Sequence, residues 1–206
     1  VMFGEGVRDK NTPYTMDADY GLTARIERKS EADWKRHDDF VGWQGEELAW
    51  LAGAAVHVSG GQTDADGDTF VDDDYSDTRG TVDFGIEGNG WNAFAALFGQ
   101  SFDVEGGESF TAFGATVQGG VFVREDIDVF AQYAWADDDA GLGQLNVITV
   151  GTNYYIHGHV LKLTVDANYA LDPITSTYNS SSRGFLVDAM GEDGQFVIRS
   201  QIQALF

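Results

Sequence analysis

The amino-acid sequence predicts an all-β protein, an antiparallel up-and-down transmembrane β-barrel. Apolar and polar residues alternate in many segments of about ten residues, which is the length and period of a barrel strand. The connections between these segments are short and long in turn, and the chain ends on an alternating apolar segment, residues 194–206. Composition agrees, since 26 Gly, only 2 Pro and 13% aromatic residues favour strands and turns over helices.

Nine alternating segments, preceded by a possible strand stub at residues 1–7, predict about nine to ten strands in this chain. In the first of them, residues 20–29, Leu22 and Ile26 face one side and Arg25 and Glu27 face the other. The later segments with clear alternation are 81–87, 128–135, 146–156, 160–169 and the terminal one. Three segments carry small or apolar residues on both faces, namely 48–58, 91–102 and 110–123.

The connections predict which end of the barrel faces which compartment. Short turns are expected at 88–90, 124–127 and 157–158, and longer loops at 59–79, 103–109, 136–144 and 170–193. Short periplasmic turns and long outer loops are typical of outer-membrane barrels. We therefore expect one barrel domain over residues 1–206, with an acidic outer loop at 59–79 and another outer loop at 170–193. The connection 30–45 is the exception, because it is long where a short turn is expected.

Charge and cysteine content narrow the classes of partner. There are 34 Asp and Glu against 12 Lys and Arg, a formal charge of −22. Nucleic acid is not expected as a partner, because phosphate binding needs clustered Lys and Arg. The absence of Cys excludes disulfides and thiol catalysis.

Polar residues on the faces opposite the aliphatic ones predict a wet barrel lumen. The residues predicted to line it are Arg25, Glu27, Asp83, Glu87, Asp128, Lys162, Asp166, Arg199 and Gln201.

An acidic stretch at residues 63–77 predicts a calcium site. Hard divalent cations prefer several carboxylate oxygens, with Gly where the backbone turns, and Gly67 lies among these acids. The stretch resembles the Asp-x-Asp-Gly-Asp loops of thrombospondin-type-3 repeats, although no Glu closes an EF-hand loop. The predicted ligands of Ca²⁺ are Asp64, Asp66, Asp68, Asp72 and Asp74. The alternative is a solvated acidic loop without metal, and no other cofactor is expected.

Catalytic motifs are absent from the sequence. It contains no Gly-x-Ser-x-Gly, phosphate loop or dinucleotide fingerprint. The pair His157 and His159 lies in a short turn with no third ligand nearby in the sequence, so exposure to solvent is the simpler interpretation. The sequence therefore predicts that the chain is not an enzyme.

Several stretches resemble porins of the phosphate-selective O/P type. They are Asp33-Trp34-Lys35 with Phe40 and Trp43-Gln44-Gly45; residues 117–123; residues 146–155 with Gly158-His159 and Lys162; and residues 192–206. The resemblance covers most of the chain from about residue 18, and it places the 30–45 connection on the periplasmic side.

The resemblance implies a trimeric, water-filled pore in the Gram-negative outer membrane. It also implies that Phe206 belongs to the terminal signal read by the barrel-assembly machinery. General porins have 16–18 strands, so the chain is expected to be the C-terminal portion of such a porin or a sequence incomplete at its start. Phosphate is not carried over as the solute, because the candidate lumen cations are scattered and matched by acids.

The predicted function is thus passive diffusion of small hydrophilic solutes and ions through an outer-membrane porin, in contact with outer-membrane lipids. The alternative is a secreted β-sandwich or surface-layer module whose Asp-rich loop binds calcium and mediates adhesion. That alternative accounts for the acidity and the missing Cys, but not for the terminal Phe or the alternating loop lengths.

Overall fold

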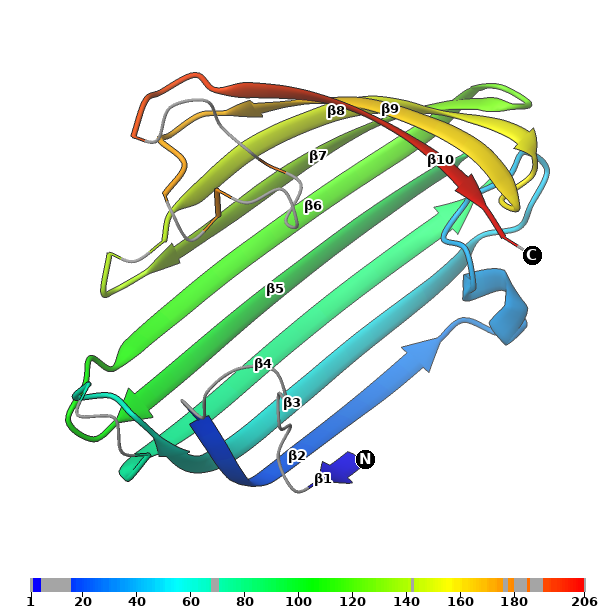
Figure 1. The fold of residues 1–206 in the computed structure, drawn as a ribbon. Helices are drawn as coiled ribbons and strands as arrows, with labels where there is room; N and C mark the ends of the chain where they lie inside the picture. Colours follow the sequence, from blue (N-terminus) through cyan, green and yellow to red (C-terminus); the bar gives the residue numbers. More distant parts are fainter. Residues whose placement is uncertain are drawn as a thin grey trace.

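The computed structural model describes residues 2–4, 16–67, 71–141, 143–175, 178–179, 185 and 191–205. Within them the chain forms ten strands and one short 3₁₀ helix (Figure 1). The elements are β1 (Met2–Gly4), β2 (Met16–Lys29), η1 (Trp34–His37), β3 (Ala49–Thr63), β4 (Asp73–Gly88), β5 (Trp91–Val104), β6 (Phe110–Arg124), β7 (Ile127–Asp138), β8 (Leu145–His157), β9 (Leu161–Ala170) and β10 (Phe196–Ala204).

All ten strands belong to one antiparallel sheet in which each strand pairs with its neighbours in the sequence, from β1 through to β10. This confirms the predicted all-β, up-and-down architecture. The β-sandwich of the alternative prediction is wrong, because a sandwich needs two packed sheets and these strands form a single one. Among the described residues, β10 pairs only with β9, and β1 covers only residues 21–23 of β2.

The predicted acidic loop 59–79 is too long. Strand β3 continues to Thr63 and β4 begins at Asp73, with Thr63 paired to Asp73 across the ladder. The connection is therefore residues 64–72, and Asp74 lies within a strand. Residues 73–80 alternate as a strand should, but the acids among them hid that pattern. In the structure, Tyr75 and Asp77 are buried while their neighbours on the other face are exposed.

The connections keep the predicted asymmetry between the two ends of the sheet. At one end, residues 89–90, 125–126 and 158–160 join strands by tight turns. At the other end the connections are residues 105–109, 139–144 and 171–195. The connection of residues 30–48, which contains η1, is the long exception at the short-turn end, as the sequence predicted. The sheet curls across its width, so that β10 runs at a steep angle to β2–β5 (Figure 1).

The two faces of the sheet differ in chemistry. We call the face that carries Arg25, Asp83 and Asp128 the inner face, because residues of the connections 30–48 and 171–195 pack against it, and the opposite face the outer face. The outer face is formed largely of aliphatic and aromatic side chains that remain exposed. They include Leu22, Ile26, Val56, Val82, Phe84, Leu97, Phe113, Val117, Val121, Val129, Tyr133, Ile148, Val150, Tyr154, Val165, Tyr169, Phe196, Ile198 and Ile202.

Among the described residues, buried hydrophobic side chains form two small clusters, and both lie where a connection meets the inner face. One contains Val147, Ala170, Ile174 and Phe185, at the long-loop end. The other contains Val41, Phe122 and Tyr155, with Trp43 packed against them, at the short-turn end. Most of the large apolar side chains of the strands are thus outside any core of this chain. Among the described residues, no helix has the length and apolar character needed to cross a membrane.

Candidate functional site: the inner face of the sheet

The strand register places all nine predicted lumen residues on the inner face. Side chains that pair directly across neighbouring strands share a face, and every second residue of a strand returns to it. Asp83 of β4 pairs with Gly53, Asp128 of β7 with Asn153, and Arg199 of β10 with Asp166 of β9. The remaining members follow from the alternation and register: Arg25 and Glu27 on β2, Glu87 on β4, Lys162 on β9 and Gln201 on β10.

Arg25 is the centre of a charged group at the β2 side of the inner face. Its Nη1 and Nη2 donate to the two carboxylate oxygens of Asp83 at 2.7 and 2.8 Å, and its Nε donates to Glu27 Oε1 at 2.7 Å. This two-point pairing fixes the orientation of the guanidinium as well as its charge. Arg25 and Asp83 lie on strands that do not pair with each other, so the contact passes over β3.

Gly53 of β3 makes that contact possible. It lies directly beneath the ion pair, and a Cβ built there would come within 2.1 Å of Arg25 Nη2 and 2.8 Å of Asp83 Oδ1. Any larger residue would therefore push the guanidinium and the carboxylate apart.

A second polar group lies across the inner face, on β7, β8 and β9. The Asp128 carboxylate accepts hydrogen bonds from Tyr155 Oη at 2.7 Å and from Asn153 Nδ2 at 2.8 Å. Thr164 Oγ1 extends this hydrogen-bond network by donating to Asn153 Oδ1 at 2.6 Å. Lys162 Nζ lies 5.9 Å from the centre of the Tyr155 ring. Nearer the edge of the sheet, Arg199 Nε pairs with Asp166 Oδ1 at 2.8 Å.

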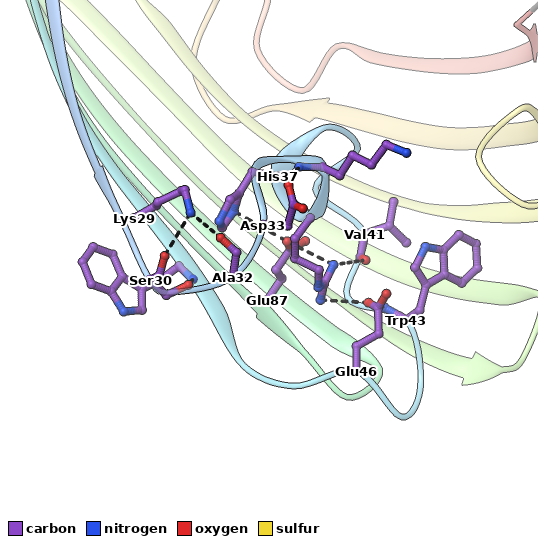
Figure 2. A network of polar contacts seen from close by, with 12 residues as sticks. Lys29, Ser30, Ala32, Asp33, His37, Val41, Trp43, Glu46 and Glu87 are labelled. Atoms are coloured by element: carbon purple, nitrogen blue, oxygen red, sulfur yellow. Dashed lines mark hydrogen bonds and ion pairs between the residues drawn. The ribbon is translucent and has the colours of Figure 1, made fainter.

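The connection of residues 30–48, here called the crossing segment, begins at the end of β2 with η1. Asp33 caps this helix, its Oδ1 accepting from the backbone N–H of Lys35. Arg36 then links the segment to the sheet, and Figure 2 shows its two carboxylate partners, Glu46 of the segment and Glu87 of β4. Its Nη1 lies 3.1 Å from Glu87 Oε1, and its Nη2 lies 2.8 Å from Glu46 Oε2. Glu87 is only 1% exposed, so Arg36 supplies the countercharge that this buried carboxylate needs.

Beyond η1 the crossing segment passes over the inner face to strands far from its own. Phe40 packs edge-on against Phe94 of β5, with ring centres 5.8 Å apart. Trp43 contacts Phe122 of β6 at 5.1 Å and Tyr155 of β8 at 4.8 Å. Between them Gly42 lies so close to β5 that a Cβ there would be 2.0 Å from the Trp91 carbonyl oxygen. A connection between the neighbouring strands β2 and β3 thus reaches from β4 as far as β8 at the short-turn end.

His37 lies in the same segment, with Nδ1 3.9 Å from Glu87 Oε1. Burial of the ring lowers the pKa of His37, and the positive charges of Lys29 and Arg36 lower it further. The imidazole is therefore neutral at pH 7, and Arg36 is the cation that faces Glu87.

The predicted calcium ligands are not gathered into a site in the described part of the chain. Asp64 Oδ1 accepts from the backbone N–H of Gly67 at 2.9 Å, so it closes the turn at residues 64–67. A residue outside the predicted ligand set also holds the loop: Asp73, the first residue of β4, accepts at Oδ2 from the backbone N–H groups of Ala65 and Asp66. No group of three potential metal ligands occurs among the described residues. Asp68 lies outside them, and calcium binding stays a prediction.

The predicted outer loop 170–193 also meets the inner face. Ala170 ends β9, and the described residues Ile174 and Phe185 pack with it against Val147. Phe206, the predicted assembly signal, lies outside the described residues.

Sequence reasoning missed the residues that fix the crossing segment, above all Arg36, Val41 and Trp43. The unusual length of the connection and its apolar content were visible signals, since a solvated turn has no need of Phe40, Val41 and Trp43. The strands against which they pack could not be read from local patterns, because those partners are about 50 to 115 residues away in the chain.

Comparisons with known proteins give little beyond the architecture. No protein-family model matches the chain. No curated protein matches it either. One solved structure that it resembles is described as OmpT (in-vitro folded), an outer membrane protein of Vibrio cholerae in a trimer form, with 15% identity and a TM-score of 0.47. The match covers 87% of this chain and 64% of that one, so this chain spans less than two thirds of the protein it matches.

One sequence-based prediction is corrected at this point. The chain was predicted not to be an enzyme because catalytic motifs were missing from the sequence. That inference is withdrawn, because missing motifs exclude only the chemistries that those motifs mark, and one fold can carry many activities.

Substituting Gly53 tests the Arg25–Asp83 contact. Gly53→Ala is expected to lower the free energy of unfolding by about 1–3 kcal/mol, because the new methyl group overlaps the ion pair. Urea unfolding measures the change. The matched control is Gly80→Ala on the adjacent strand, where the nearest atom to a new Cβ is 3.9 Å away. Equal stability of the two variants would contradict the role given to Gly53.

Proposed function

We propose that this chain forms part of the wall of a porin of the bacterial outer membrane, through which small hydrophilic solutes and ions diffuse passively. The resemblance of its motifs to phosphate-selective porins of the O/P type supports this proposal. By the same resemblance we propose a homotrimer, and assembly through the barrel-assembly machinery with Phe206 in the terminal signal. Phosphate itself is not part of the proposal.

The observation that carries the proposal is the reversal of polarity between the two faces. The outer face leaves large apolar side chains in the open, with Ile26, Ile198 and Ile202 each about 70% exposed or more. The inner face carries the charged and hydrogen-bonding groups instead. Soluble proteins rarely expose an apolar surface that extends over a whole sheet, whereas lipid is its natural solvent.

The inner face suits passage of polar solutes. Its charges are of both signs and largely paired, as with Arg25 and Asp83 or Arg199 and Asp166. No single sign dominates the wall, and the overall charge of −22 enriches cations near the pore at low salt. The crossing segment narrows the passage at the short-turn end, since it lies over β4 to β8 inside the curl.

Ion conductance, in a planar lipid bilayer, of the intact porin that contains this sheet is the direct test. We expect discrete conductance steps and, in a salt gradient, a reversal potential of the sign that indicates preference for cations. The preference is expected to weaken as salt rises. Protein that stays soluble without detergent and gives no steps would contradict the proposal.

Two neighbouring residues of β10 test the assignment of faces. Ile202 is 73% exposed on the outer face and Gln201 lies on the inner face. Ile202→Lys is expected to cost about 2–4 kcal/mol at the bilayer midplane, whereas Gln201→Lys places the same charge beside water. Refolding yield into lipid vesicles measures the difference. Similar yields for the two variants would show that the outer face does not meet lipid.

Removing the anchor of the crossing segment tests its position in the pore. Trp43→Ala deletes the ring that packs on Phe122 and Tyr155, so the segment is expected to move and single-channel conductance to increase. Leu48→Ala is the control, because Leu48 belongs to the same segment and is exposed. Unchanged conductance in Trp43→Ala would mean that the segment does not restrict flow.

A further inference from the structure

A row of phenylalanines runs along the inner face and is unexpected in a water-filled passage. Strand β5 carries Phe94, Phe98 and Phe102, four residues apart, so all three lie on the same face. Register confirms which face it is, since Phe94 pairs with Gly85 and Gln118, and Phe102 pairs with Asp77. At about 3.3 Å per residue, successive rings are about 13 Å apart and the row follows most of the strand.

Further rings extend the row at both ends. At the short-turn end Phe40 of the crossing segment lies edge-on to Phe94. At the long-loop end Phe102 stacks with Tyr75 of β4 at 5.8 Å and with Phe110 of β6 at 5.5 Å. An aromatic path therefore connects the narrow end of the curled sheet with the other end.

The middle ring of the row, Phe98, is exposed on the inner face of the sheet. Phe98 is 47% exposed, and its ring lies over Gly114 of β6, where a Cβ would come within 2.0 Å of the ring. Because one face of the ring covers this glycine, the other face is turned away from the sheet. An aromatic face held flat and exposed in this way is available for stacking against a ligand.

Polar groups alternate with the rings. Between Phe94 and Phe98, Ala96 pairs with Asp83 on one side and Thr116 on the other. Between Phe98 and Phe102, Gln100 pairs with Arg79. Arg79 and Gln100 are both held by Asp77, with Arg79 Nε 2.8 Å from Oδ2 and Gln100 Nε2 3.0 Å from Oδ1.

Cavities lie along this path. One of about 220 Å³ is lined by Phe98 together with Gln100, Arg79 and His57. Another of about 350 Å³ lies at the crossing segment and is lined by Phe94, Phe40, Gln118 and Asp83, among others.

This alternation selects a class of ligand. A purely apolar ligand would cover Arg79 and Asp83 without replacing their contacts with water, at a cost in free energy. A small inorganic ion would gain nothing from the rings. A sugar chain has apolar C–H faces on its rings and hydroxyl groups around their edges, which matches rings separated by hydrogen-bonding side chains.

We propose that the inner face of β5 is a saccharide-binding track, in which the open face of Phe98 stacks on a sugar ring, Phe94 and Phe102 with their aromatic neighbours form apolar ends of the track, and Arg79, Gln100 and Asp83 bind hydroxyl groups. The proposal rests on the proposed function and names the class of solute that passes. Saccharides would then slow the ion current by occupying the track.

Block of the ion current by maltohexaose tests the track. We expect the sugar to reduce the conductance of the unmodified channel in a saturable way. Phe98→Ala is expected to raise the half-blocking concentration by about three- to tenfold, from loss of one stacking contact, and Phe98→Tyr to restore it. Leu97→Ala is the matched control, because the adjacent Leu97 is 59% exposed on the outer face. Polyethylene glycol of similar size controls for simple obstruction.

Calorimetry of the detergent-solubilised chain with maltohexaose measures the same binding without a channel. Channels that conduct, but are blocked no better by maltohexaose than by polyethylene glycol, overturn the track and leave the pore intact. Sugar binding in calorimetry from a chain that forms no channel keeps the track and overturns the pore. Equal effects of Phe98→Ala and Leu97→Ala also overturn the track.

Discussion

The two-residue period of the strands is the constraint on which the rest of this structure depends. Because successive side chains point to opposite faces, a shift of one residue in any pairing would turn Arg25, Asp83 and Asp128 outward and bring Ile26, Val82 and Val129 inward. Each strand pairs with its neighbours in the sequence, so one consistent register carries the separation of charge and apolar surface from β2 to β10. The sheet therefore keeps its charged and apolar surfaces apart without a large buried core.

Much of the fold could be predicted because this period is local. Gln201 and Ile202 were assigned to opposite faces from the sequence, and the ladder between β9 and β10 places them so. The start of β4 was missed because acids occupy both faces over residues 73–77, which conceals the alternation from a reading based on hydrophobicity. The single aromatic ring at Tyr75 and the buried Asp77 are recognised as strand positions only once their pairing is known.

The inner face was predictable as a set of residues but not as an arrangement. Alternation assigned Arg25, Glu27 and Asp83 to the same polar face. The two-point contact between Arg25 and Asp83, however, depends on the absence of a side chain at Gly53, on the strand between them. The spacing of Phe94, Phe98 and Phe102 on β5 can be seen in the sequence. Small or apolar residues on both faces of this segment, however, left open which face is the inner one. Contacts between strands decided both cases, and a single sequence does not display them.

The crossing segment has a consequence for the order in which the chain can fold. Hairpins between consecutive strands have low contact order and can form one after another. The segment belongs to the hairpin of β2 and β3, but Val41 and Trp43 rest on Phe122 and Tyr155, which arrive only with β6 and β8. The docking of Val41 and Trp43 is therefore a late event that waits for five more strands, and until then these apolar residues are without their final partners. A passage lined by this sheet would be wide while it assembles and would narrow only at completion.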